Sequence, residues 1–369
     1  MTEIVREFVS AESPTMARAG AGGRPCQGVW YRSASSRPSV GLIATHYDVD
    51  FSEHYLAGLL AERGYGFLGW NTRYRGLGTY FVLDSALVDI AVGVRWLREV
   101  AGVGTVALLG NSGGASLMAA YQSRAHSGAA DAQGGASRSG TAISPPGDLF
   151  ISLNAHPGRP DVLTSWLDPS VTDEADPLSL DPSLDMFDPA NGPPYRPDFV
   201  ARYRAAQQAR NERITAWVLD ERDRLRAAGA RDRVFNVHRA WADLRFLDLS
   251  LDPSERPPGC YLGDPRLANY GSFGLACTTS LRAWLSMWSL SESDCRAGPH
   301  LASISEPALV LQSTGDQGCY PADARAIFGA LGGDDKRLDM TAGDHYLLHP
   351  EGARELVADI VSAWLGERA

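Results

Sequence analysis

The chain contains 369 residues, 44% of them hydrophobic and 21% charged, which is the composition of an ordinary globular protein. A chain of this length can form one large domain with an insertion, or two domains. Its formal net charge of −10 disfavours nucleic acid as a partner. No run of about 18 apolar residues is present, so we expect no membrane span and no membrane partner.

Further features of the sequence narrow the class of protein. The first residues, Met1 to Glu7, show no basic region followed by an apolar core, so we expect no secretory leader and a cytoplasmic location. Five widely spaced cysteines form no C-x-x-C pair, which argues against a disulfide framework and a zinc knuckle. Residues 110–114 fit neither a dinucleotide loop nor a P-loop, and no H-E-x-x-H motif is present. We therefore expect neither a cofactor nor a metal.

Strand and helix patterns alternate over the first part of the chain. Short apolar runs predict buried strands, and apolar residues that recur every three or four positions predict helices. After two strands at 4–9 and 29–31, the expected order is strand 40–44, helix 52–63, strand 65–70, helix 82–100, strand 105–109, helix 113–124, a long loop at 125–147 and strand 149–153. Such alternation predicts an α/β protein with a mostly parallel central sheet flanked by helices.

The same patterns return at the end of the chain, after a long segment of different character. The expected late elements are strand 308–312, helix 321–331, strand 336–340 and helix 350–365. The segment between comprises an irregular Pro- and Asp-rich part at 154–197, a helix at about 198–228 and an aromatic-rich part at 234–300. We therefore expect a core formed by residues 1–153 and 306–369, and a large, mainly helical lid at 154–305 inserted after the sixth strand.

A single serine stands between glycines just past the strand at 105–109. The pattern Gly110-Asn-Ser112-Gly-Gly114 matches G-x-S-x-G, a tight strand-to-helix turn that exposes a serine above a parallel sheet. Glycines are needed there because a Cβ would clash with the neighbouring strand and helix. The pattern predicts that Ser112 is a nucleophile.

Ser112 needs an imidazole to accept its proton and a carboxylate to orient that imidazole. Asp316 and His345 each follow a predicted strand, and should therefore lie at the same edge of the sheet as Ser112. The chain order of serine, aspartate and histidine is the one that this arrangement requires. We expect Ser112, Asp316 and His345 to form a catalytic triad.

Taken together, these segments resemble the α/β-hydrolase superfamily. Residues 110–114 look like its nucleophile elbow, the Asp316 loop like its acid loop, and Gly343-Asp-His345 like its histidine loop. The segment Arg73-Tyr-Arg75-Gly76 is similar to an Asp-x-Arg-Gly segment of the superfamily, with Asn71 in place of the aspartate. The resemblance covers residues 40–124, 149–153 and 307–369, and implies an α/β-hydrolase fold. A serine at the elbow disfavours the dehalogenase and epoxide-hydrolase members, which have an aspartate there.

The loop after the third strand departs from the superfamily pattern. Where His-Gly-x is usual, this chain has His46-Tyr47-Asp48. The resemblance implies an oxyanion hole in which the backbone N–H of Gly113 acts with that of Asp48 or Tyr47. We expect His46 to orient this loop and the Tyr47 hydroxyl to pack.

Other carboxylates compete with Asp316 for the role of the acid. Asp344 adjoins His345 along the same strand, so we prefer Asp316. Asp161 and Asp168 follow the sixth strand, a less usual position for the acid, and stay open as alternatives.

The sequence thus predicts a serine hydrolase, a carboxylic ester hydrolase that cleaves an ester or lactone of a small, neutral and fairly apolar molecule through an acyl-enzyme. The same triad could instead cleave a C–C bond or transfer the acyl group to another acceptor. A catalytically silent ligand-binding member of the fold is a further alternative. We expect a small-molecule substrate and leave homo-oligomerisation open.

Overall fold

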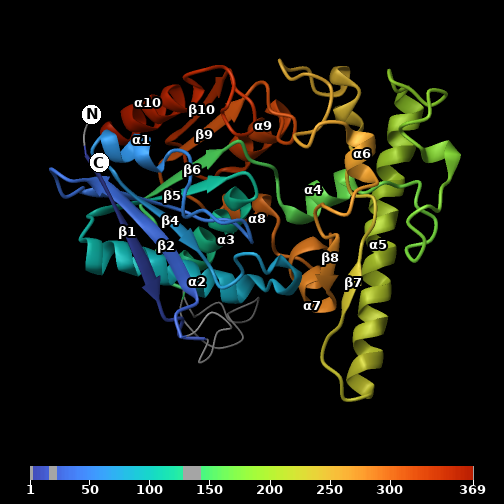
Figure 1. Ribbon diagram of the computed structural model, residues 1–369, viewed down its shortest axis with the longest axis horizontal. Helices are drawn as coiled ribbons and strands as arrows, with labels where there is room; N and C mark the ends of the chain where they lie inside the picture. Colours follow the sequence, from blue (N-terminus) through green and yellow to red (C-terminus); the bar gives the residue numbers. More distant parts are fainter. Residues whose placement is uncertain (1–2, 16–22, 128–142, 369) are drawn as a thin grey trace.

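Over residues 3–15, 23–127 and 143–368, which the computed structural model describes, an eight-stranded sheet forms the centre of the protein (Figure 1). The strand order is β1-β2-β4-β3-β5-β6-β9-β10. These strands are β1 (Ile4–Ala11), β2 (Cys26–Ser33), β3 (Val40–Ala44), β4 (Gly66–Asn71), β5 (Thr105–Asn111), β6 (Leu149–Leu153), β9 (Ala308–Ser313) and β10 (Lys336–Thr341). Strand β2 pairs antiparallel with β1 and β4, and all other pairs are parallel. The expected mostly parallel sheet is confirmed, and the carboxyl ends of its parallel strands lie at one edge.

Helices cover both faces of the sheet (Figure 1). They are α1 (Ala57–Glu62), α2 (Leu83–Trp96), α3 (Gly114–Ser127), α8 (Ala297–Leu301), α9 (Pro321–Ala330) and α10 (Ala353–Gly366). Successive residues of a buried strand point to opposite faces. In β3, Leu42 therefore belongs to the core beneath α1 and α10, and Ile43 to the core beneath α2 and α3. Leu109 and Leu108 of β5 divide in the same way, and burial of each such side chain contributes about 1.5–3 kcal/mol.

Residues 154–305, which we call the insertion, leave the sheet after β6 and return to it at β9. Its other elements are α4 (Arg159–Trp166), α5 (Pro197–Ala227), β7 (Val234–Asn236), α6 (Pro265–Asn269), β8 (Thr278–Ser280) and α7 (Leu281–Ala283). Figure 1 shows the long helix α5 on the side of the insertion that faces away from the sheet. A buried ion pair between Arg239 and Asp168, 2.6 Å apart, stabilises its interior. Helix α8, at the end of the insertion, packs against α3 and α9 of the sheet body.

The expected and observed elements differ at several places: β2 is longer than expected, α10 begins at Ala353, and β7 and β8 were not expected. Helix α1 begins at Ala57 instead of Ser52, because the Ser52 hydroxyl accepts a hydrogen bond from Asn71 (2.8 Å) and so does not cap a helix. The segment at 154–197, expected to be irregular, contains α4. The loop expected at 125–147 lies mainly outside the described residues, and its first three residues belong to α3.

Within the described part of the chain, no helix has both the length and the apolar character needed to cross a bilayer.

Candidate active site

Ser112 occupies the sharp turn between β5 and α3. Its φ of 55° lies in the left-handed region, which costs a residue with a side chain about 1–3 kcal/mol. The Ser112 N–H donates to the Leu153 carbonyl (2.9 Å), so the turn is tied to the end of β6. A Cβ on Gly114 would overlap the Thr45 carbonyl oxygen, so this glycine lets α3 start directly against the end of β3.

Asn111, the residue before the serine, anchors the turn through hydrogen bonds of its side chain. Its side-chain Nδ2 donates to the Leu153 carbonyl (3.0 Å), and its Oδ1 accepts a hydrogen bond from the Tyr55 hydroxyl (3.1 Å). The same oxygen lies 3.2 Å from Nε2 of His54. These contacts join the elbow to β6 and to the segment before α1, so Ser112 stands on a rigid support.

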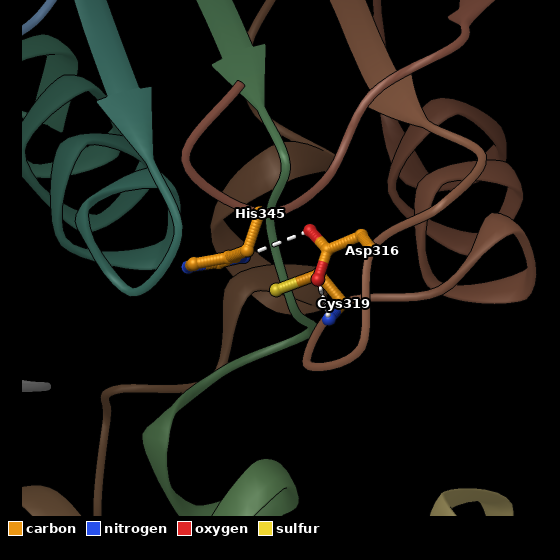
Figure 2. A group of neighbouring side chains, drawn as sticks. All are labelled: Asp316, Cys319 and His345. Atoms are coloured by element: carbon orange, nitrogen blue, oxygen red, sulfur yellow. Dashed lines mark hydrogen bonds and ion pairs between the residues drawn. The ribbon is translucent and has the colours of Figure 1, made fainter. Parts of the chain in front are cut away.

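Asp316 and His345 lie on the loops after β9 and β10 and face each other (Figure 2). His345 Nδ1 is 2.8 Å from Asp316 Oδ2. The second carboxylate oxygen, Oδ1, accepts the backbone N–H groups of Gly318 (2.7 Å) and Cys319 (2.9 Å). Because Nδ1 is bonded to the carboxylate, Nε2 of His345 remains to accept a proton.

The environment of His345 favours an imidazole that can take up a proton. Its ring stacks on Tyr261, with centroids 5.3 Å apart and planes 13° apart, and meets Tyr346 edge-on. Burial by itself disfavours the imidazolium, but the charge and hydrogen bond of Asp316 outweigh it and raise the pKa of His345 above its ordinary value of 6.5.

Asn154 joins the strand ends that carry these groups. This residue is fully buried, its Oδ1 accepts the backbone N–H of Ser313 (2.7 Å) and its Nδ2 donates to the carbonyl of His345 (3.3 Å). Its own N–H donates to the Leu311 carbonyl (2.9 Å). One side chain therefore links β6, the end of β9 and the loop of His345.

The thiol of Cys319 lies beside the acid and the base (Figure 2). Its Sγ, a carboxylate oxygen of Asp316 and a ring nitrogen of His345 all lie within 4.8 Å of one another. Ser112 and His345 border one cavity, so the serine lies at the same edge of the sheet as the Asp316–His345 pair. Burial, followed by the charge of Asp316, raises the pKa of Cys319 well above its ordinary value.

The loop after β3, residues 46–48, lies against the start of α3. The Tyr47 hydroxyl is 3.0 Å from the Ser116 hydroxyl in the interior, and the ring is fully buried. The Asp48 carbonyl accepts the N–H of Gly76 (2.7 Å), which fixes the loop to the segment after β4. In the described part of the chain, the backbone N–H groups of Tyr47, Asp48 and Gly113 donate no hydrogen bond to another protein group.

Asn71, which replaces the aspartate of the superfamily pattern, supports the same loop. Its Oδ1 accepts the N–H of Phe51 (2.9 Å) and its Nδ2 donates to Asp50 (2.8 Å). An amide can accept and donate at once, which a carboxylate cannot do.

The competing carboxylates have other partners. Asp344 accepts three backbone N–H groups of its own turn, those of Tyr346, Leu348 and His349. Asp161 pairs with Arg296 (2.9 Å), and Asp168 with Arg239. The carboxylate that His345 meets is that of Asp316.

A cavity of about 770 Å³ opens between the sheet edge and the insertion. Ser112 and His345 line it, with residues 46 and 48–51 of the β3 loop on the same side. The insertion contributes much of the opposite wall, including Trp241, Tyr261, Phe273, Leu275 and Trp288. The wall is therefore largely aromatic and aliphatic.

One charged side chain in this cavity was missed by the sequence analysis. Arg159, the first residue of α4, is buried and borders the cavity beside Gly113. The signal that could have identified it is an arginine shortly past the carboxyl end of β6, at the edge where the site was expected. Asn154 was missed as well, although it directly follows the same strand.

Solved structures match nearly the whole chain. DcsB in complex with its substrate analogue aligns over 98% of this chain and 99% of its own, at 12% identity and a TM-score of 0.56. The α/β hydrolase GrgF from Penicillium sp. sh18 aligns over 98% and 97%, at 12% identity and a TM-score of 0.51. The esterase domain of a Rhodothermus marinus protein aligns over 98% of both chains, at 14% identity and a TM-score of 0.48. No protein-family model and no curated protein matches the sequence. The protein has the α/β-hydrolase fold, as the resemblance implied.

Proposed function

We propose that the protein is a serine hydrolase that cleaves a carboxylic ester or lactone through an acyl-enzyme. One observation carries the proposal: Ser112, on a strained elbow, and His345, which pairs with Asp316, border the same cavity. These three side chains supply an orienting carboxylate, a base and a nucleophile.

The reaction begins when Ser112 Oγ attacks the substrate carbonyl while His345 Nε2 takes the hydroxyl proton. The tetrahedral oxyanion accepts hydrogen bonds from the N–H of Gly113 and from that of Asp48 or Tyr47. Collapse of this intermediate breaks the bond from the carbonyl carbon to the ester oxygen, and His345 returns its proton to the leaving alcohol. Water, deprotonated by His345, then cleaves the acyl-enzyme, releases the acid and restores Ser112.

The cavity supports a substrate with a hydrocarbon body. Its aromatic wall, formed by side chains such as Trp241 and Phe273, favours apolar contact, and its volume of about 770 Å³ falls in the range of small-molecule sites. An ester or lactone with an aliphatic or aromatic part fits this lining.

Labelling of the full chain with a fluorophosphonate, followed by peptide mapping, tests the proposal. We expect one adduct, at Ser112. An adduct at another residue would refute the mechanism, and the absence of any adduct would favour a ligand-binding protein without catalysis.

Two variants make the test specific. Ser112→Ala should abolish labelling and lower the turnover of short-chain esters by about 10³-fold or more, because the triad acts as a unit. Ser127→Ala, at the exposed end of the same helix α3, should label and turn over like the unaltered protein. Equal turnover by Ser112→Ala and the unaltered chain would show that the nucleophile lies elsewhere.

A further inference from the structure

Arg159 is a cation buried inside the catalytic cavity. Its side chain is only 6% exposed, yet the residue belongs to the cavity lining together with Ser112 and His345. Burial of an unpaired charge is costly, and proteins normally compensate it with a partner of opposite sign. The question is therefore what neutralises this guanidinium.

Aromatic side chains hold the guanidinium in place. Its carbon lies 4.7 Å from the ring centre of Tyr47 and 5.5 Å from that of Trp288. Tyr47 follows β3 and Trp288 belongs to the insertion, so Arg159 is held between the β3 loop and the insertion. A guanidinium fixed in this way is pre-organised, because little side-chain entropy is left to lose on binding.

The protein itself compensates this charge only weakly. The nearest carboxylate oxygen of the described residues, on Asp48, lies 3.8 Å from Nη2 of Arg159, and its side chain is 40% exposed. The closest ring nitrogen of His46 is 3.2 Å from the same Nη2, but burial first and Arg159 second lower the pKa of His46 far below its ordinary value, so this ring is neutral. Among the described residues, Nε of Arg159 has no hydrogen-bond partner. A buried N–H donor of a cation is thus left unpaired beside the cavity.

This donor lies beside the reacting carbonyl. A Cβ placed on Gly113 would be 3.0 Å from Nε, Nη2 and the central carbon of Arg159. Gly113 supplies an N–H to the oxyanion in the proposed mechanism, so Arg159 lies on the side of the carbonyl oxygen. The leaving alcohol must receive its proton from His345 and therefore lies on the other side.

We propose that Arg159 binds a carboxylate carried by the acyl part of the substrate, a short distance from the scissile carbonyl. This inference rests on the proposed serine hydrolase function and refines it. The substrate class becomes a monoester of a dicarboxylic acid, or a lactone that carries a carboxylate on its acyl chain. Its apolar alcohol part lies against the aromatic wall. The neutral substrate expected from the sequence is thereby replaced by an anionic one.

A carboxylate suits this position better than the oxyanion alone. Arginine N–H groups form a planar fork that matches the two oxygens of a carboxylate, and a permanent anion neutralises the buried cation already in the bound ground state. An arginine that served only the transient oxyanion would act equally on neutral and anionic esters. The two roles therefore make different predictions.

The first experiment compares benzyl hydrogen succinate with benzyl butyrate, which differ only in a terminal carboxylate against a methyl group. Release of benzyl alcohol gives kcat/KM for each ester with the full chain and three variants. We expect the unaltered protein to prefer the succinate ester and Arg159→Gln to reduce this preference by about 10²-fold or more, because it removes one partner of a buried charge pair. Arg159→Lys, which keeps the charge, should retain part of the preference.

Arg296→Gln is the matched control. Arg296 lies near α4, pairs with Asp161 and is half-exposed, so its loss removes the same charge from the same region without altering the guanidinium beside Gly113. This variant should keep the full preference for the succinate ester. No preference in the unaltered protein, or an equal loss on both esters in Arg159→Gln, would overturn the inference while leaving the hydrolase proposal intact.

A binding measurement separates this inference from the proposed function. Succinanilic acid and butyranilide are anilides that carry the same two acyl groups and resist hydrolysis, and calorimetry with the full chain gives their affinities directly. We expect tighter binding of succinanilic acid, lost in Arg159→Gln and kept in Arg296→Gln. If this holds while neither ester is cleaved and fluorophosphonate leaves Ser112 unmodified, the hydrolase proposal fails and the carboxylate site stands. Thermal unfolding shows whether Arg159→Gln folds. If it does not, the inference is tested by the unaltered chain, which should prefer the succinate ester, and by Arg159→Lys, which should keep part of that preference.

Discussion

At the scale of single residues, two opposing effects act on the imidazole of His345. Burial disfavours its charged form, and the Asp316 carboxylate, 2.8 Å away and fully buried, favours it more strongly. Without the carboxylate, the same burial would make His345 a weak base that accepts the proton of Ser112 poorly. In the proposed mechanism, Asp316 therefore raises the basicity of His345 as well as orienting its ring.

The pH profile of the reaction should report this balance. Only neutral His345 can act as the base, so kcat/KM should fall as the pH drops through its pKa, which lies above 6.5. In Asp316→Asn the raising influence is removed and burial remains, so the acidic limb should move to lower pH while kcat falls by about 10³-fold or more. Profiles of kcat/KM against pH for both proteins give the two midpoints. An unchanged midpoint in Asp316→Asn would show that this carboxylate does not control the base.

Short patterns in the sequence are enough to predict the three candidate triad residues and their places in the fold. Ser112 lies in a five-residue motif, and Asp316 and His345 follow strands that their apolar runs reveal. Arg159 and Asn154 could not be identified in this way, because their significance depends on neighbours from distant segments. Arg159 lies against Tyr47, Trp288 and Gly113, and no local sequence pattern predicts these contacts.

At the scale of elements, the carboxyl ends of β6, β9 and β10 are held in register by one amide. The Asn154 side chain satisfies the backbone N–H of Ser313 and binds the carbonyl of His345, both in the interior. These strand ends carry the acid and the base, so their relative position is set by hydrogen bonds as well as by sheet pairing.

Asn154→Ala should therefore lower the free energy of unfolding by about 1–3 kcal/mol, because the N–H of Ser313 is left buried and unpaired. Urea denaturation measures this change, and kcat should fall with it since the loop of His345 loses a support. Asn236→Ala, at the exposed end of β7, provides a control that should stay within about 0.5 kcal/mol. A similar small effect in Asn154→Ala would mean that sheet pairing alone orders these ends.

The parallel strands of the central sheet agree with the expected ranges to within two residues, whereas β2 is longer than the expected 29–31, and β7, β8 and the short helices were predicted less well. The run Val40–Ala44 agrees with β3 at both ends, because a fully buried strand must be apolar throughout. Helix α1 begins later than expected because the Ser52 hydroxyl accepts a hydrogen bond from Asn71, at the end of β4. Helix α4 was missed because it has only eight residues, and the six that are buried include the polar Arg159 and Thr164, so its apolar residues form no periodic pattern. Hydrogen bonds to distant residues thus determine helix boundaries that the local sequence pattern does not fix.

At the scale of the whole molecule, the cavity exists only because the insertion faces the sheet edge. Tyr261 of the insertion stacks on His345, and Trp166, Trp241 and Phe246 form an aromatic group behind it. The sequence indicated that aromatic residues gather between 234 and 300, but not which of them meet the base. That contact depends on how the insertion folds back over the sheet.

The Tyr261 ring should matter more than its hydroxyl. Tyr261→Ala removes the surface against which the imidazole stacks, so we expect kcat/KM for small esters to fall by about tenfold through misplacement of the base. Tyr261→Phe keeps the ring and should stay within about twofold of the unaltered protein. Steady-state kinetics with one short-chain ester compares both variants, and equal losses would assign the effect to the hydroxyl instead.

The separation of β6 and β9 along the chain has a consequence for how the protein is made. These strands are neighbours in the sheet, although the entire insertion lies between them in sequence. The entropy of closing so long a loop grows only as about (3/2)RT ln n, so the finished fold tolerates it, but non-local pairing of this kind slows folding. During synthesis, β3 to β6 and the nucleophile emerge well before the acid and the base. Until β9 arrives, the nascent chain carries an apolar β6 edge without its partner strand, and at this stage it is most exposed to aggregation and most dependent on chaperones.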